Sequence, residues 1–110
     1  MIKIIWLSFD LGVNGDYEGM YAWLDNHAAK ECGDSVAVFN YEFRNDLLAD
    51  LKSDMEQSVE LNKKSRIYVI YKSDDGRKVK GSFLYGARKQ SPWTGYGVSM
   101  EESSSDESTS

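Results

Sequence analysis

The chain has 110 residues, of which 41% are hydrophobic and 13% aromatic, as expected for one folded domain with a buried core. No apolar run is long enough to cross a membrane, and the short apolar start lacks the small-residue cleavage site of a secretory signal. The single cysteine, Cys32, excludes an internal disulfide and a cysteine zinc cluster, so we expect a reducing, cytoplasmic location.

The net charge of −5 hides a strong separation of charge along the chain. Residues 1–62 contain four basic and twelve acidic residues, whereas residues 63–90 contain nine basic residues and only two acids. Residues 91–110 add four acids and no base. This pattern predicts a local basic surface that the overall acidity conceals, or else a basic hairpin whose field is largely cancelled by acidic helices beside it.

The first expected element is a central strand over residues 2–9, which are almost continuously apolar, as in strands covered on both faces. Turn residues follow, and Asp16 is placed to cap a helix whose apolar residues recur every three or four positions from Tyr17. Gly33 has the conformational freedom of a left-handed C-cap, so this helix is predicted to end near Cys32.

A second strand is expected over residues 35–43, because apolar residues alternate there. Ala37, Phe39, Tyr41 and Phe43 share one face of this strand, and Val36 and Val38 begin the other. Asn45 or Asp46 can cap a second helix, which ends around residues 62–65. Two strand-like runs then flank an Asp-Gly pair at positions 75 and 76, which is a strong hairpin signal.

The predicted order is therefore β-α-β-α-β-β, which indicates an α+β, ferredoxin-like sandwich with an antiparallel sheet and two helices on one face. We assign residues 1–98 to this single domain. The expected sheet core under the two helices consists of Ile4, Trp6, Val38, Ile70 and Phe83. Residues 99–110 form an acidic, serine-rich stretch that cannot offset its ordering entropy, so we expect a disordered tail.

Asp10 ends the first predicted strand and begins a glycine-containing loop, a position that projects its carboxylate at the rim of the sheet. Asn14, Asp16 and Glu18 follow closely and offer further oxygen ligands of the kind that hard divalent ions need. The alternative is that Asp10 closes a turn and that Asp16 and Glu18 favour the helix N-terminus through its dipole.

The run Ile4-Ile5-Trp6-Leu7-Ser8-Phe9-Asp10, followed by a loop, a helix and a second strand, resembles the opening of two families of small proteins. These are the CRISPR adaptation endoribonuclease-like family and the virulence-associated protein D family. The resemblance implies a ferredoxin-like fold, a homodimer and metal-dependent nuclease activity. It also implies that Asp10 is the metal-site carboxylate and faces its symmetry mate across the dimer.

Basic residues interleaved with aromatic ones near the C-terminal hairpin form the main candidate binding surface. Phosphate binding needs cations, and base stacking needs accessible rings. The candidate nucleic-acid-binding residues are Arg66, Lys72, Arg77, Lys78, Lys80, Arg88 and Lys89. The interleaved rings are Tyr68, Tyr71, Phe83 and Tyr85. Alternatively, the lysines protect an edge strand from aggregation.

His27 and Cys32 are the two remaining residues with catalytic chemistry, and both are expected to be structural. His27 has no triad partner that spacing establishes. Cys32 ends an apolar helix face, so we expect a small buried residue rather than a nucleophile.

We expect a small dimeric binding module that contacts nucleic acid, either RNA or DNA, or an acidic protein partner through the basic hairpin. Dimerisation is expected through an open sheet edge and the aromatic segment from Trp93 to Tyr96. One alternative is a nuclease in which two Asp10 carboxylates hold Mg²⁺ at a dimer interface. Another alternative is an inhibitor whose acidic helices mimic DNA.

Overall fold

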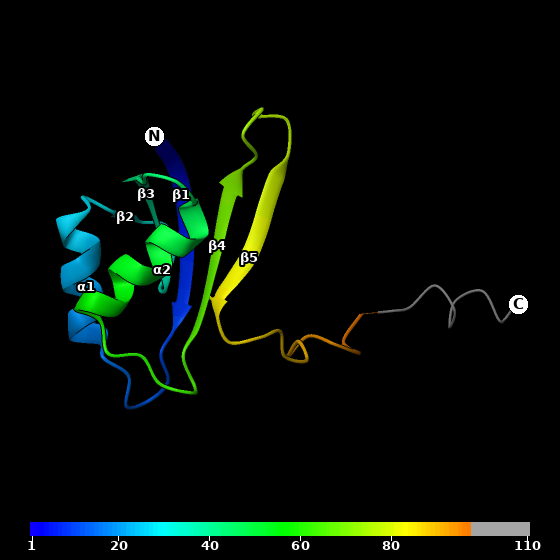
Figure 1. Cartoon of the computed structure of the whole chain (residues 1–110). Coiled ribbons are helices and arrows are strands. Elements are labelled where there is room, and N and C mark those ends of the chain that lie inside the picture. The colour runs from blue at the N-terminus through cyan, green and yellow to red at the C-terminus, as the bar shows by residue number, and fades with distance from the viewer. Residues whose placement is uncertain (98–110) are drawn as a thin grey trace, which may run out of the picture.

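The computed structural model describes residues 1–97, which form a five-stranded antiparallel sheet and two helices (Figure 1). The elements in chain order are β1 (Ile2–Asp10), α1 (Tyr17–Asn26), β2 (Lys30–Glu31), β3 (Val36–Glu42), α2 (Leu47–Ser58), β4 (Arg66–Lys72) and β5 (Val79–Tyr85). The strand order across the sheet is β2-β3-β1-β4-β5. The α+β class and the central place of β1 are thus confirmed, whereas the predicted tail over residues 99–110 lies outside the described residues.

Carboxylates cap both helices, as the sequence predicts. Asp16 accepts a hydrogen bond from the Gly19 N–H at 2.9 Å, and a second one from the Glu60 N–H at 3.0 Å. These two bonds, the one from Glu60 above all, lower the pKa of Asp16, and they tie the start of α1 to the chain just after α2. Asp46, rather than Asn45, caps α2 by accepting from the Ala49 N–H at 2.9 Å.

The predicted end of the first helix is wrong, because α1 stops at Asn26 and not near Cys32. Ala28 adopts a left-handed φ of 55°, and the chain then forms the short strand β2 against β3. Gly33 lies in the turn between β2 and β3 instead of capping a helix. Pairing with β3 outweighs the helix propensity of the residues after Ala28, which adds a strand to the predicted order.

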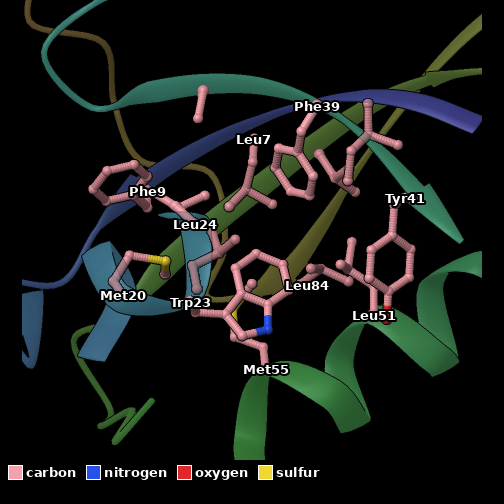
Figure 2. Close-up of a cluster of buried hydrophobic side chains, with 14 of the residues drawn as sticks. Leu7, Phe9, Met20, Trp23, Leu24, Phe39, Tyr41, Leu51, Met55 and Leu84 are labelled. Atoms are coloured by element: carbon pink, nitrogen blue, oxygen red, sulfur yellow. The ribbon is translucent and has the colours of Figure 1, made fainter. Parts of the chain in front are cut away.

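The buried core lies between the two helices and one face of the sheet, called here the helix face. Odd-numbered residues of β1 and β3 point into it, including Ala37, Phe39 and Tyr41, and Phe43 just after β3 is buried as well. Trp23 of α1 packs edge-on against Phe39, with ring centroids 5.6 Å apart (Figure 2). The helices close the core with Met20, Trp23, Leu24, Leu47, Leu51 and Met55.

The predicted sheet core of Ile4, Trp6, Val38, Ile70 and Phe83 is wrong in phase. The strand register places these residues on the opposite side of the sheet, called here the open face, and Ile4 is 43% exposed. Ile5 and Leu7, one residue further along β1, are fully buried instead. Side chains of a strand alternate between the two faces of the sheet. In a strand that is apolar at both odd and even positions, the sequence therefore does not show which face is buried.

Candidate nucleic-acid interface

A groove of about 980 Å³ lies at one end of the sheet, where three chain segments meet. These are the loop after β1, the loop before β4, and the residues that follow β5. The cationic residues that line it are Lys63, Lys64, Arg66, Arg88 and Lys89. Asp10 is the single acidic residue of the lining. We call this the basic groove, and its charges favour an anionic ligand.

The position of Arg66 follows from the sheet register. It is the first residue of β4 and lies opposite Asp10 of β1, so both side chains stand on the open face at the end of the sheet. Its Nε donates a hydrogen bond to the Ala87 carbonyl at 3.2 Å. This bond holds the segment after β5 against the start of β4.

Gly86 makes the return of the chain toward Arg66 possible. Its φ of 79° lies in the left-handed region, and a Cβ there would come within 2.8 Å of both the Arg66 Cγ and the Ser65 carbonyl oxygen. Only glycine fits this close approach without strain. The tight turn brings Arg88 and Lys89 to the same groove as Arg66.

An aromatic pair lies beside the basic groove on the open face. Phe83 of β5 is opposite Tyr68 of β4, and the two rings meet edge to face with centroids 4.8 Å apart. The guanidinium carbons of Arg66 and Arg88 lie 5.7 and 5.9 Å from the centre of the Phe83 ring. Cations at these distances are attracted to the ring face, so both guanidinium groups and the ring form one cluster.

The two other predicted rings do not join this cluster. Tyr71 and Tyr85 are partly buried against the core on the helix face, and the Tyr85 hydroxyl donates to the Lys52 carbonyl at 3.4 Å. Alternation along β4 and β5 therefore divides the aromatic set between the two faces of the sheet.

The structure also divides the predicted basic set between two ends of the sheet. Arg66, Arg88 and Lys89 line the basic groove. The other four, Lys72, Arg77, Lys78 and Lys80, lie at or near the β4–β5 turn. Six residue steps separate Arg66 from Lys72, which is about 20 Å of extended strand.

Carboxylates offset part of the positive charge at the β4–β5 turn. Asp74 accepts from the Lys3 Nζ at 2.7 Å, and this bond lowers the pKa of Asp74. Asp75 accepts from the Ser73 hydroxyl at 2.6 Å and from the Arg77 N–H at 3.0 Å, and both bonds lower the pKa of Asp75. The turn therefore has a weaker positive field than the basic groove, which has one acid among five cations.

Lys63 and Lys64 are functional candidates that the site prediction missed. They lie in a turn that Asn62 and Ser65 fix: the Asn62 N–H donates to the Ser65 hydroxyl at 3.0 Å, and the Lys64 N–H donates to the Asn62 side chain at 2.8 Å. Their position directly before β4 could have identified them. In the β4–β5 hairpin the start of β4 and the end of β5 lie together, so residues before β4 are close to residues after β5.

Asp10 lies in the basic groove, at the sheet rim where the sequence predicts it. Its carboxylate accepts from the Gly12 N–H at 3.1 Å, which closes the turn after β1. Across residues 1–97, no group of three or more His, Cys, Asp or Glu side chains is placed to hold a metal ion. Within the described part of the chain, Asp10 is therefore the one carboxylate that lines this groove.

The acidic side of the molecule is a second groove, of about 820 Å³, between the end of β3 and α2. Burial, together with the hydrogen bond that Tyr41 donates to Asp54 at 3.0 Å, raises the pKa of the Tyr41 phenol. Asp50 accepts from the Arg44 and Asn45 N–H groups at 2.7 and 3.3 Å. These carboxylates therefore have structural roles in holding α2 against β3.

Neither His27 nor Cys32 lines the basic groove. The His27 ring packs on Trp23 at 4.3 Å between centroids, and its Nε2 lies 3.5 Å from the Asp54 carboxylate. Cys32 is exposed in the β2–β3 hairpin, so the expectation of a buried cysteine is wrong. The early end of α1 explains this, since Cys32 is not on a helix.

Comparisons of the chain with protein-family models, curated proteins and solved structures found no match. None of the helices in residues 1–97 combines the length and the apolar character that a membrane span needs.

Proposed function

We propose that this protein binds single-stranded nucleic acid, with the phosphate backbone in the basic groove and bases against the Phe83 and Tyr68 rings. The observation that carries the proposal is the meeting of five cations from two chain segments beside an aromatic pair. Cations that neutralise phosphates release counterions, and rings beside them stack on bases of any sequence. Both ingredients of single-strand binding are therefore next to each other.

The proposed fold type is ferredoxin-like, extended by one strand. The elements β1 to β4 follow the order β-α-β-β-α-β, which is the order of that fold, and β5 adds a strand beyond β4. Both helices lie against one face of the sheet, and within residues 1–97 no helix covers the other face (Figure 1). A free sheet face beside a basic groove is a suitable platform for a single strand.

A cytoplasmic location is part of the proposal. The chain has one cysteine, and the structure leaves its thiol exposed. Exposed free thiols are compatible with reducing compartments, where disulfides are rare.

The position of Asp10 favours a second candidate function, a Mg²⁺-dependent nuclease. Its carboxylate lies in the basic groove, where a bound phosphate would lie near it. One carboxylate does not make a Mg²⁺ site by itself, because the ion usually binds through one or two carboxylates together with substrate phosphates and water. Residues 1–97 of one chain supply one carboxylate toward such a site.

The two protein-directed alternatives have less support. An acidic protein partner would be attracted by the cations, but it would make no specific use of the half-buried Phe83 and Tyr68 ring pair. An inhibitor that mimics DNA needs free carboxylates on the helices. Asp16, Asp46 and Asp50 accept backbone hydrogen bonds at or near the helix starts, which leaves Glu18, Asp25 and Glu56 as the exposed carboxylates of α1 and α2.

Titration of a labelled oligonucleotide over a range of salt tests the proposed function. We expect a fluorescein-labelled strand of about 15 nucleotides, oligo(dT) or oligo(U), to bind at about 50 mM NaCl. The slope of log affinity against log salt should approach about −3.5, because five cations each contribute about −0.7 on single strands. Fluorescence anisotropy measures both quantities.

An oligo-glutamate peptide of equal charge serves as the matched competitor. We expect it to compete much more weakly than an unlabelled oligonucleotide, because it offers no bases to the rings. Absence of oligonucleotide binding at about 50 mM NaCl, or an affinity that does not change with salt, would contradict the proposal. Equal competition by the peptide would favour an acidic protein partner instead.

A further inference from the structure

Two exposed aromatic rings follow the basic groove along the chain. Trp93 is 72% exposed and Tyr96 is 86% exposed. By contrast, Trp23 is buried in the core and Trp6 is half-buried on the sheet. Every residue from 92 to 97 is exposed, so no element in the described part of the chain covers these two rings. Aromatic side chains dominate the energetics of interfaces, and two of them exposed in one short segment indicate a binding surface.

A β-turn holds the two rings close together. The Tyr96 N–H donates a hydrogen bond to the Trp93 carbonyl at 3.1 Å. Gly95 has a left-handed φ of 89° at the third position of this turn, where glycine is favoured. The Cα atoms at the two ends of such a turn are less than about 7 Å apart. We call this turn, residues 93–96, the aromatic turn.

The aromatic turn is a short distance along the chain from the basic groove. Lys89 lines the groove, and Trp93 is four residues further on, so their Cα atoms are at most about 14 Å apart. A preceding turn, in which the Thr94 N–H donates to the Ser91 carbonyl at 3.1 Å, shortens this path. Figure 1 shows that the chain after β5 leaves from the end of the sheet where the loops after β1 and before β4 also lie. A ligand in the groove can therefore extend onto the aromatic turn.

We infer that the aromatic turn is a second base-stacking surface, which binds the same single strand as the basic groove. The inference rests on the proposed function and extends its site to Trp93 and Tyr96. Rings beside a cationic groove stack on the bases of single strands with little sequence preference. The Tyr68 and Phe83 rings are half-buried and contact each other. The aromatic turn therefore adds free ring faces to those of this pair.

The composition of this segment suits nucleic acid better than a protein partner. Residues 86–97 contain two cations, Arg88 and Lys89, and no acid. Protein interfaces bury their aromatic residues in a well-packed apolar centre. Residues 91–97 contain no Val, Leu, Ile or Met side chain that could form such a centre around the rings. Stacking on bases needs only accessible ring faces with cations nearby, and both are present here.

Titration of the full chain with fluorescein-labelled oligo(dT) of about 15 nucleotides at about 50 mM NaCl tests the inference. We expect the alanine variant, Trp93→Ala with Tyr96→Ala, to bind at least about 10-fold more weakly, because it loses two stacked bases. The slope of log affinity against log salt should not change, since no cation is removed. The phenylalanine variant, Trp93→Phe with Tyr96→Phe, keeps a ring at both positions and should bind within about 3-fold of the wild type.

Tryptophan fluorescence provides a second measurement. A base stacked on an indole ring quenches its fluorescence, and Trp93 is the exposed one of the three tryptophans. We expect unlabelled oligo(dT) to quench the fluorescence of the wild type. Most of this quenching should be absent in Trp93→Phe, although that variant still binds.

The matched control is Tyr21→Ala, which removes an exposed tyrosine of α1 that does not line the groove. We expect its affinity to stay within about 3-fold of the wild type, because this ring is not part of the proposed site. A loss as large as that of the alanine variant would count against stacking at the aromatic turn. Circular dichroism confirms that each variant is folded.

Three further results would overturn the inference. The first is an alanine variant that binds within about 3-fold of the wild type, and the second is a phenylalanine variant as weak as the alanine variant. The third is a wild-type dimer at about 50 µM that the alanine variant converts to a monomer in sedimentation, which would mean that a second copy covers the rings.

Failure of the proposed function gives a different pattern. If Arg66→Ala with Arg88→Ala bound as tightly as the wild type, the groove would not be the binding site. Tight binding by the alanine variant together with weak binding by this arginine variant would overturn the present inference alone. Absence of wild-type binding would contradict both.

Discussion

Replacement of Arg66 and Arg88 together by alanine is expected to weaken oligonucleotide binding by about 10-fold to 100-fold at about 50 mM NaCl. Both guanidinium groups line the basic groove and lie beside the Phe83 ring. The change removes two phosphate contacts and the cations that face the ring. The slope of log affinity against log salt should fall in magnitude by about 1.4.

The matched control removes two arginines that lie outside the groove. Arg44→Ala with Arg77→Ala produces the same change in net charge, and both side chains are exposed, Arg44 after β3 and Arg77 in the β4–β5 turn. We expect a loss of less than about 3-fold, since only the general field of the protein changes. Equal losses in the two double variants would show that binding depends on net charge and not on the groove.

The second large effect concerns stability and depends on which face of β1 is buried. Ile5→Ala should lower the free energy of unfolding by about 2–5 kcal/mol, because Ile5 is fully buried under the helices and its truncation leaves a cavity. Ile4→Ala should lower it by about 1 kcal/mol or less in the monomer, because Ile4 stands partly exposed on the open face.

Urea unfolding at about 1 µM protein measures both variants and limits any contribution from dimerisation. The two positions are adjacent and carry the same residue, so β propensity is matched. A larger loss for Ile4→Ala than for Ile5→Ala would mean that the phase of β1 is reversed and that Ile4 belongs to the core.

The sequence predicts most of the fold because local signals agree with the tertiary contacts. Asp16 and Asp46 cap the two helices, and Gly76, with a left-handed φ of 73°, sits in the predicted hairpin turn. The alternation predicted for β3 is confirmed, because Val36 and Val38 lie on one face and the buried Ala37 and Phe39 on the other. Periodicity gives this alternation, but it does not say which face is buried.

Local signals fail where the answer depends on the rest of the molecule. Along β1, apolar residues occupy both faces, so only the position of the helices selects Ile5 over Ile4. The end of α1 depends on the pairing of β2 with β3. Residues 27–33 contain no local sequence signal for this pairing. Propensity is a weak signal in both places, because tertiary contacts override it.

The candidate site shows the same limit. Charge clustering identifies the basic segment, but it cannot tell which cations share a location. The register of β4 and β5 separates Lys72 and Lys80 from Arg66 by most of the length of the sheet, and the turn at Gly86 brings Arg88 back to Arg66. The groove is therefore defined by which residues are close in space, and not by the composition of the segment.

The most direct test of the proposed groove is an amide chemical-shift map of ¹⁵N-labelled protein titrated with an oligonucleotide of about 15 nucleotides at about 50 mM NaCl. Binding at the groove predicts the largest shifts in residues 10–14, 62–66 and 83–89, which are far apart in sequence and meet at one end of the sheet. The largest shifts in the β4–β5 turn, residues 73–78, or on α1 and α2 would contradict it.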